Sequence, residues 1–293
     1  MIYILENDLM KVKVSSMGAE LQSIRRKESD TEYLWQGDPD FWKGRAANVF
    51  PICGRLVNGK YTYGGNVYEL GCHGFARACE WTVIHQKATA LTLQLQANGE
   101  TLANYPFKFS MEIAYTLTDT ALSVAMIVHN LDDKTMYFAL GGHPGFNLPM
   151  ENGQVFEDYY IEFDEPCEPQ LLVLSDTCFY TGKTAPYPLE EGKRLALHHS
   201  LFDNDALFFE NTAKGVTLRS ATGERSVHMT FPELKYVGLW HTPHAEAPFV
   251  CIEPWSGVPS LDLPGIVALE DKPEMTALQP QETYRNTYTM DFN

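Results

Sequence analysis

Apolar and polar residues alternate with a period of two through much of the chain. In residues 91–96, leucines at every second position are separated by polar side chains, and residues 109–117 and 122–128 repeat the pattern on either side of a polar turn. Residues 216–219, 227–231 and 288–292 alternate in the same way. This period is typical of strands with one buried face, so we expect at least two long hairpins and a carboxy-terminal strand.

No window shows the periodicity of an amphipathic helix, and only a short stretch such as residues 99–104 could form a single turn. Many short strands separated by Gly, Pro and Asn turns indicate an all-β fold, either a sandwich or a barrel. Alternation is weakest in residues 151–191, which we interpret as long loops within the fold. Since no repeat or linker divides the chain, we predict one domain over residues 1–293.

Charge excludes several classes of function. The chain has 293 residues, with 22 Lys and Arg against 38 Asp and Glu, which gives a formal net charge of −16. A nucleic-acid binder normally presents a basic face to phosphates, and docking on anionic membranes also needs a basic patch. We therefore expect neither a nucleic-acid partner nor a membrane partner. At this length, folding can bury on the order of 75% of the unfolded surface, so a large core is expected.

The amino terminus and the cysteines point to a reducing compartment. The first residues carry acids and no basic leader, and no apolar run approaches the ~20 residues of a membrane span. The six cysteines show no C-x-x-C spacing, which disfavours a zinc site. We expect reduced, mostly buried thiols and a cytoplasmic location.

Three glycine-containing segments combine a titratable group with a neighbouring aromatic residue. They are residues 71–77 with His73, residues 141–147 with His143, and residues 251–257 with Glu253. Two imidazoles and a carboxylate are sufficient for acid–base chemistry near neutral pH. Taken singly, each is more often structural, and sequence distance does not show that the three meet.

Two other groups of histidines resemble metal ligands. They are His198 with His199, and His241 with His244. A third ligand at regular spacing is missing, so surface or loop histidines are the favoured interpretation, and no metal is expected.

A set of motifs in a fixed order adds a family resemblance. The segments are Trp35, residues 41–42, 50–56, 73–77, 142–147, 202–207 and 253–255. In this order they resemble the aldose 1-epimerase (galactose mutarotase-like) family, and its LacX-like branch in particular. The resemblance implies a large antiparallel β-sandwich and an isomerase of carbohydrate metabolism, a mutarotase that interconverts the anomers of a free hexose without a cofactor.

The resemblance also implies roles for individual residues. Glu253 would be the general base that accepts the proton of the C1 hydroxyl, and His143 the general acid that protonates the ring oxygen. His73 would hydrogen-bond the sugar near that oxygen. For this pair to act, Glu253 must be ionised and His143 protonated, and we expect mutual attraction to hold both charges.

Further residues are implied as sugar ligands. Arg55 would bind the substrate near the same edge, and Asp205, with Asp203 as the weaker candidate, would fix ring hydroxyls. The aromatic rings of Trp240, Trp255 and Phe146 could stack on the sugar, although large aromatic residues more often fill the core.

Two departures from the family pattern leave the substrate open. Gly145 stands where the better-known branch carries an aromatic residue, which favours a wider pocket. The segment of residues 73–77 is also similar to hexose-6-phosphate epimerases, so Arg77, with Arg45 or Lys43, could hold a phosphate. A structural ion pair of Arg77 with a nearby acid is equally compatible with the sequence.

The function of the whole protein stays open in the same way. A hexose-6-phosphate 1-epimerase would use the same chemistry on a phosphorylated sugar, and a non-catalytic sugar-binding module would keep the fold without turnover, because a fold does not determine a function. A homodimer is compatible with the sequence.

Overall fold

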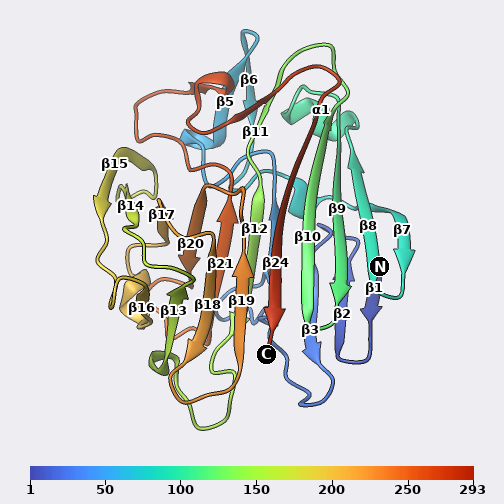
Figure 1. The fold of residues 1–293 in the computed structure, drawn as a ribbon. Helices are drawn as coiled ribbons and strands as arrows, with labels where there is room; N and C mark the ends of the chain where they lie inside the picture. Colours follow the sequence, from blue (N-terminus) through green and yellow to red (C-terminus); the bar gives the residue numbers. More distant parts are fainter.

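Two large antiparallel sheets make up most of the fold in the computed structural model, which describes all 293 residues (Figure 1). The strands of the nine-stranded sheet are, in spatial order, β16 (Arg194–Ala196), β13 (Tyr159–Phe163), β18 (Gly215–Ser220), β19 (Ser226–Thr230), β24 (Thr283–Phe292), β10 (Ala121–Asn130), β9 (Phe109–Thr118), β8 (Ala90–Gln96) and β7 (Thr82–Lys87). Those of the seven-stranded sheet are β15 (Tyr180–Pro186), β14 (Gln170–Leu174), β17 (Leu207–Glu210), β20 (Tyr236–Trp240), β21 (Phe249–Trp255), β12 (Gly141–Asn147) and β4 (Ala46–Val49).

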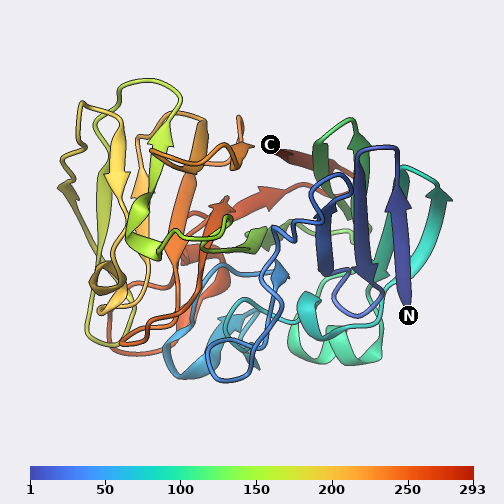
Figure 2. The ribbon, with the colours of Figure 1, turned by 90° about the horizontal axis from the view of Figure 1, so that it is seen from below.

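Three small sheets and a few helical turns complete the chain. The small sheets pair β1 (Ile2–Glu6), β2 (Met10–Ser15) and β3 (Leu21–Arg26); β22 (Val267–Ala268), β5 (Lys60–Tyr63) and β6 (Asn66–Glu69); and β11 (Met136–Phe138) with β23 (Thr276–Leu278). The helical elements are η1 (Val57–Gly59), η2 (Ala76–Ala78), α1 (Gly99–Asn104), η3 (Phe156–Asp158), η4 (His199–Phe202) and η5 (Leu269–Asp271). In Figure 2 the dark blue strands β1–β3 stand at the opposite end of the molecule from the yellow strands.

The period-two segments form the strands that the sequence predicts. They become β8, β9, β10, β18, β19 and β24, and β9 pairs with β10 as a long hairpin around Asp119 and Thr120. The short helix α1 coincides with the predicted turn, and the Asn98 side chain caps it. The all-β prediction is confirmed, and the sandwich implied by the family resemblance is confirmed with it.

The interpretation of residues 151–191 as long loops is wrong. This stretch contains η3, β13, β14 and β15. β14 and β15 lie at the edge of the seven-stranded sheet, and most of β15 is exposed or only partly buried. An edge strand buries neither face completely, so its sequence lacks a clear alternation of apolar and polar residues.

The core lies between the two large sheets and decides which strand residues face the site. A single cluster of 61 buried residues takes members from both sheets, including Val250 and Ile252 of β21. Successive side chains of a strand point to opposite faces. Cys251, Glu253 and Trp255 therefore turn away from this core, toward the outer face of the seven-stranded sheet.

A buried hydrogen-bond network fixes β4, one of the strands beside the site, to the rest of the fold. The Asn48 amide donates to the carbonyl oxygens of Gly18 and Ala19 at 3.0 Å each, and the Tyr115 hydroxyl of β9 donates to Ala19 O at 2.6 Å. Because these carbonyls have no access to water, the network also satisfies groups that would otherwise destabilise the fold.

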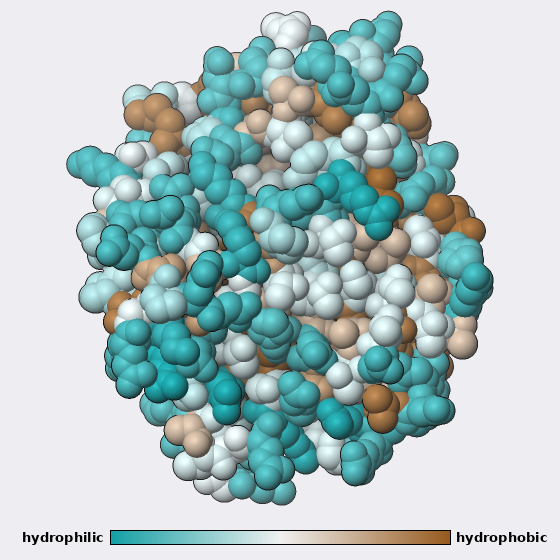
Figure 3. Space-filling model, in the orientation of Figure 1, coloured by the Kyte–Doolittle hydropathy of each residue, from teal (hydrophilic) through white to brown (hydrophobic).

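The surface, the cysteines and the helices can each be compared with what the sequence predicts. Polar residues dominate the face seen in Figure 3, where apolar residues are scattered. All six cysteines are free, as the sequence predicts, but the expectation that most are buried is wrong: only Cys53 and Cys251 are buried, and the other four are partly exposed. No helix has both the length and the apolar character needed to cross a membrane.

Candidate active site

Neighbouring strands bring His143 and Glu253 together on the outer face of the seven-stranded sheet. The pairing of β12 with β21 aligns Gly141 with Trp255 and Gly145 with Cys251, which places His143 directly opposite Glu253. The flanking strands contribute small residues, Ala47 opposite His143 and Gly238 opposite Glu253. The strand register alone therefore juxtaposes the two groups, which the sequence separates by more than a hundred residues.

The imidazole and the carboxylate are close but leave most of their hydrogen-bonding capacity unused. His143 Nε2 lies 3.3 Å from Glu253 Oε1, without hydrogen-bond geometry. His143 is 7% exposed and Glu253 is 1% exposed. Neither oxygen of Glu253 nor Nδ1 of His143 has a hydrogen-bond partner in the protein. Buried polar groups are nearly always paired, so three such atoms beside a pocket indicate a place for a polar ligand.

Burial shifts both pKa values toward the neutral forms. Loss of solvation raises the pKa of Glu253 well above 4.5 and lowers the pKa of His143 to about 3. The sequence-based expectation, that mutual attraction holds both groups charged, is therefore wrong for the free protein. The free energy lost when each charged group is removed from water exceeds the free energy gained from attraction to its partner. Over a wide range of pH the pair carries one proton, which burial places on the carboxyl group.

His73 reaches the same place from a loop. Its backbone has a φ of +63°. The Gly54 N–H donates to His73 Nδ1 at 3.3 Å, which makes Nδ1 the acceptor and leaves the proton on Nε2. Burial lowers the pKa of His73 well below 6.5, and the nearby His143 contributes in the same direction. His73 is thus a neutral hydrogen-bond donor beside the pair.

Gly74 allows this loop to pack against Phe50, the residue that directly follows β4. It adopts a φ of +71°, and a Cβ atom at this position would lie 2.2 Å from the carbonyl oxygen of Phe50. Only glycine combines this backbone conformation with such close contact. Gly74 thereby sets the position of the preceding residue, His73.

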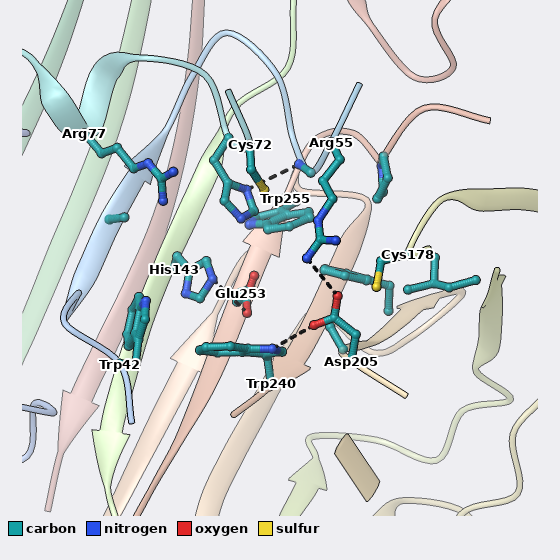
Figure 4. A pocket seen from close by; sticks show the side chains of 17 residues that line it. Trp42, Arg55, Cys72, Arg77, His143, Cys178, Asp205, Trp240, Glu253 and Trp255 are labelled. Atoms are coloured by element: carbon teal, nitrogen blue, oxygen red, sulfur yellow. Dashed lines mark hydrogen bonds and ion pairs between the residues drawn. The ribbon is translucent and has the colours of Figure 1, made fainter. Parts of the chain in front are cut away.

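Asp205 and Arg55 form one end of the pocket. Asp205 Oδ1 accepts a hydrogen bond from Trp240 Nε1 at 2.9 Å, and Oδ2 lies 3.5 Å from Arg55 Nη2 (Figure 4). Asp203 lies 3.3 Å from His244 and does not line the pocket. Of the two aspartates considered from the sequence, Asp205 is the one that faces the cavity.

Arg77 lies at the other end of the pocket in Figure 4. It makes no ion pair and no side-chain hydrogen bond, so the interpretation of Arg77 as a structural ion pair is wrong. Arg45 and Lys43, the two further cations suggested as phosphate ligands, do not line the pocket. Arg45 bonds to Gln22 and to the carbonyl oxygen of Gln36 beside β3. The guanidinium of Arg77 is exposed and lines the pocket, so it is available to a ligand.

Aromatic residues form the walls of the pocket. The indole of Trp42 stacks on the His143 ring with centroids 4.9 Å apart, and Trp240 meets the same ring edge to face at 5.6 Å. Trp255 is buried and donates from Nε1 to Gly142 O at 3.1 Å. The resemblance pointed to Trp42 without giving it a role, because nothing in its sequence context shows that its loop folds back over β12.

Two expectations about β12 need correction. Phe146 cannot stack on a sugar, because it is fully buried in the core cluster. It lies three positions from His143, and on a strand an odd spacing places two side chains on opposite faces. Gly145 does not widen the pocket either, since Trp35 and Trp42 lie within 3.2 Å of where its Cβ would be.

The cavity favours a small ligand. Its volume is about 220 Å³, below the roughly 300–1,000 Å³ typical of pockets for drug-sized molecules. Besides the residues above, Cys72, Cys178 and Phe208 line it. Nothing in the sequence singles out these three residues, because their places depend on loop conformation and on long-range strand pairing.

One group in this site has the distances of a metal-binding cluster. Ligand atoms of His143, Cys251 and Glu253 all lie within 4.8 Å of one another. Burial and the neighbouring Glu253, however, raise the pKa of the Cys251 thiol well above 9.0. A protonated thiol is a poor metal ligand, so these three groups do not favour a metal site.

The histidines expected at the surface include one that is completely buried. His241 is 0% exposed, and its Nε2 lies 3.0 Å from Nδ1 of His199. His241 is therefore a loop residue, as one of the two expected alternatives has it, but it is not at the surface. Its burial depends on Phe156, Phe202 and Phe249, which pack around it from distant parts of the chain.

Comparison with protein families gives a match over almost the whole chain. The family model described as aldose 1-epimerase matches residues 1–290. Among curated proteins, the plasmid and chromosomal LacX proteins of Lactococcus lactis subsp. lactis are each 35% identical over 300 residues. Each match covers 97% of both proteins.

Solved structures agree with this result. The chain is similar to a galactose mutarotase related enzyme from Lactobacillus acidophilus, with 34% identity, a TM-score of 0.94, and coverage of 100% of this chain and 97% of that one. It is also similar to a galactose mutarotase-like protein from Lactobacillus casei, with 31% identity, a TM-score of 0.93 and full coverage of both chains.

The closure of the His73 loop can be tested at two glycines. We expect Gly74→Ala to lower the free energy of unfolding by about 2–3 kcal/mol, because the added methyl group meets the Phe50 carbonyl in a strained backbone conformation. Gly71→Ala is the matched control, since no atom lies within 4 Å of its Cβ position. Urea denaturation measures both. Equal stabilities of the two variants would show that the loop is not held as described.

Proposed function

The chain belongs to the aldose 1-epimerase family, and from this premise we propose that it interconverts the α and β anomers of a free hexose. The observation that carries the proposal is the buried pair of Glu253 and His143, 3.3 Å apart beside a small cavity, with both carboxylate oxygens free of protein partners. Family membership supports an enzyme of the isomerase type. The substrate and the roles of the residues are our proposal.

Ring opening requires one proton to be removed and one to be delivered. In our proposal, Glu253 accepts the proton of the C1 hydroxyl while His143 donates a proton to the ring oxygen. The C1–O5 bond breaks, its electron pair stays on O5, and C1 becomes an aldehyde carbon. Rotation about C1–C2 and the reverse proton transfers close the ring on the other face. The protein ends with the same number of protons, so no cofactor is needed.

The one-proton state of the pair suits this cycle. Ionised Glu253 with protonated His143 is the tautomer of the neutral pair, so one internal proton transfer produces the reactive form. A sugar hydroxyl that donates to Glu253 would favour this tautomer, since hydrogen bonds to a carboxylate stabilise its charge. His73, as a neutral donor through Nε2, would stabilise charge that develops on the ring oxygen.

The remaining pocket residues are proposed to position the ring. Asp205 and Arg55 would bind hydroxyl groups at one end, and Trp240 and Trp255 would contact apolar ring faces. Fixing the reacting atoms near both proton-transfer groups lowers the barrier in addition to the acid–base effect. The cytoplasmic location, the single domain and a homodimer remain predictions from the sequence.

Removing either proton-transfer group tests the proposal. We expect Glu253→Gln and His143→Ala each to slow protein-catalysed anomer exchange by about 10²–10⁴-fold, because each abolishes one proton transfer. Sugar binding should largely survive. Exchange between α and β signals at C1 is measured by NMR at equilibrium with glucose and galactose, after subtraction of the spontaneous rate.

The chain offers a matched control for these variants. His129 Nε2 lies 3.8 Å from Glu112 Oε1 on the nine-stranded sheet, away from the pocket. Glu112→Gln and His129→Ala should leave exchange within about twofold of wild type. Unchanged turnover in both Glu253→Gln and His143→Ala would show the assigned roles to be wrong. Sugar binding by a wild-type protein that does not speed exchange would point instead to a binding module.

The pH dependence of kcat/KM follows from the shifted pKa values. On the acid side, activity should fall as pH drops toward 3, where His143 takes up a second proton and Glu253 stays protonated. On the alkaline side, activity should fall as pH rises through the raised pKa of Glu253, because the pair then loses its only proton. The profile is measured by NMR exchange. A rate that does not fall as the pH drops to 3, or one that rises throughout the pH range, would contradict the proposal.

A second candidate is the same reaction on a hexose 6-phosphate. The observation that favours it is the unpaired Arg77 at the end of the pocket opposite Asp205. Guanidinium groups bind phosphate oxygens with paired hydrogen bonds, and Arg77 has none of its capacity engaged within the protein.

Substitution of Arg77 distinguishes the two substrates. If Arg77 holds a phosphate, Arg77→Gln should raise KM for glucose 6-phosphate by about tenfold or more and leave the KM for glucose within about twofold. Lys43→Gln is the control, because Lys43 is an exposed cation nearby that does not line the pocket. Exchange rates at several concentrations of each sugar give the KM values. An equal effect of Arg77→Gln on both sugars would exclude a phosphate-specific role.

A further inference from the structure

A ladder of three side-chain contacts joins the segment that carries Asp205 to the end of β20. His199 contacts His241 at 3.0 Å, Asp203 contacts His244 at 3.3 Å, and Asp205 contacts Trp240 at 2.9 Å. Residues 199–205, which precede β17, therefore lie beside residues 240–244, at the end of β20. The two segments meet where β17 and β20 begin to pair. Only the last of the three contacts belongs to the pocket.

The contact between the two histidines has a defined direction. His241 Nδ1 lies 2.7 Å from the carbonyl oxygen of Thr242, which can only accept, so the Nδ1 nitrogen carries the proton. Burial lowers the pKa of His241 to about 4, so the ring is neutral near pH 7. Its Nε2 must then be the acceptor, and His199 Nδ1–H the donor.

His241 holds both ends of η4. Its ring accepts the hydrogen bond from His199 at the first residue of η4 and packs against Phe202, the last residue, with centroids 4.2 Å apart. The outer side of His199 is covered in turn, since Phe156 stacks on it at 4.1 Å and Glu157 Oε1 lies 3.8 Å from its Nε2. A helix of four residues is not stable by itself, so these contacts fix η4.

Asp205 needs such support because its backbone is strained. It has a φ of +74°, in the left-handed region that non-glycine residues rarely adopt. A residue keeps such a conformation only where its surroundings hold it, and strain of this kind concentrates at functional sites. The Asp205 N–H donates to Phe202 O at 3.0 Å. This hydrogen bond couples the position of Asp205 to that of η4.

We propose that His199 and His241 are positioning residues that fix η4 and thereby aim the Asp205 carboxylate at Trp240 and at the pocket. The proposal rests on the proposed function in one respect, namely that Asp205 binds sugar hydroxyls. Neither histidine lines the cavity, so both act only through Asp205.

The first test needs neither sugar nor turnover. The five tryptophans give five indole N–H signals in a ¹H–¹⁵N NMR spectrum. The signal lost in Trp240→Phe identifies Trp240, and Asp205→Asn shows where it lies when the carboxylate acceptor is gone. We expect His241→Leu and His199→Leu to shift this signal toward its Asp205→Asn position. An unchanged signal in a folded variant would overturn the proposal.

The second test separates positioning from general stability. In our account, each Leu variant raises KM roughly 3- to 10-fold, the expected effect of losing one hydrogen bond, while kcat stays within about twofold. Added to Asp205→Asn, the same substitution should have almost no further effect on KM. An equal increase in KM with and without Asp205 would overturn the proposal, because the histidines would then act by another route.

Matched variants complete the design. His241→Gln keeps an acceptor for the His199 proton and should restore the Trp240 signal and KM. His228→Leu removes a histidine paired with Asp164 on the nine-stranded sheet and should change neither. If His241→Leu does not fold, His199→Leu carries the test, since His199 is only partly buried. A shifted Trp240 signal together with a wild type that does not catalyse exchange would support the positioning role and refute the proposed function.

Discussion

The buried carboxylate–imidazole pair is the constraint on which the rest of the site depends. Glu253 and His143 are held out of water by the face of a sheet, and the protein leaves three of their polar atoms without partners. Burial keeps the pair at one proton by raising one pKa and lowering the other. Such an arrangement costs stability, and it is useful only if a ligand completes it.

Some groups of this site lie on strands and others on loops. The strand register of β12, β20 and β21 places His143 beside Glu253, since regular backbone hydrogen bonds fix positions well. Loops with left-handed residues, His73 and Asp205, add the groups proposed to bind the sugar. In our proposal, contacts outside the pocket hold the strained backbone of Asp205 in place, and the buried His241 makes two of these contacts.

The sequence predicted the long strands because a period of two reports directly on a face that packs against the core. It did not predict β14 and β15 at the edge of the seven-stranded sheet, because β15 buries neither face and its sequence shows no clear alternation. His73, His143 and Glu253 stood out as motifs, but only the family resemblance joined them. Phe146 could have been excluded by its odd spacing from His143, whereas the burial of His241 depends on three distant phenylalanines and could not.

The measurement that tests the central claim most directly is anomer exchange at C1 by NMR, with wild-type protein and free glucose or galactose at equilibrium. The account predicts that the exchange rate exceeds the spontaneous rate in proportion to protein concentration. No acceleration with either free sugar, at any pH between about 5 and 9, would contradict it.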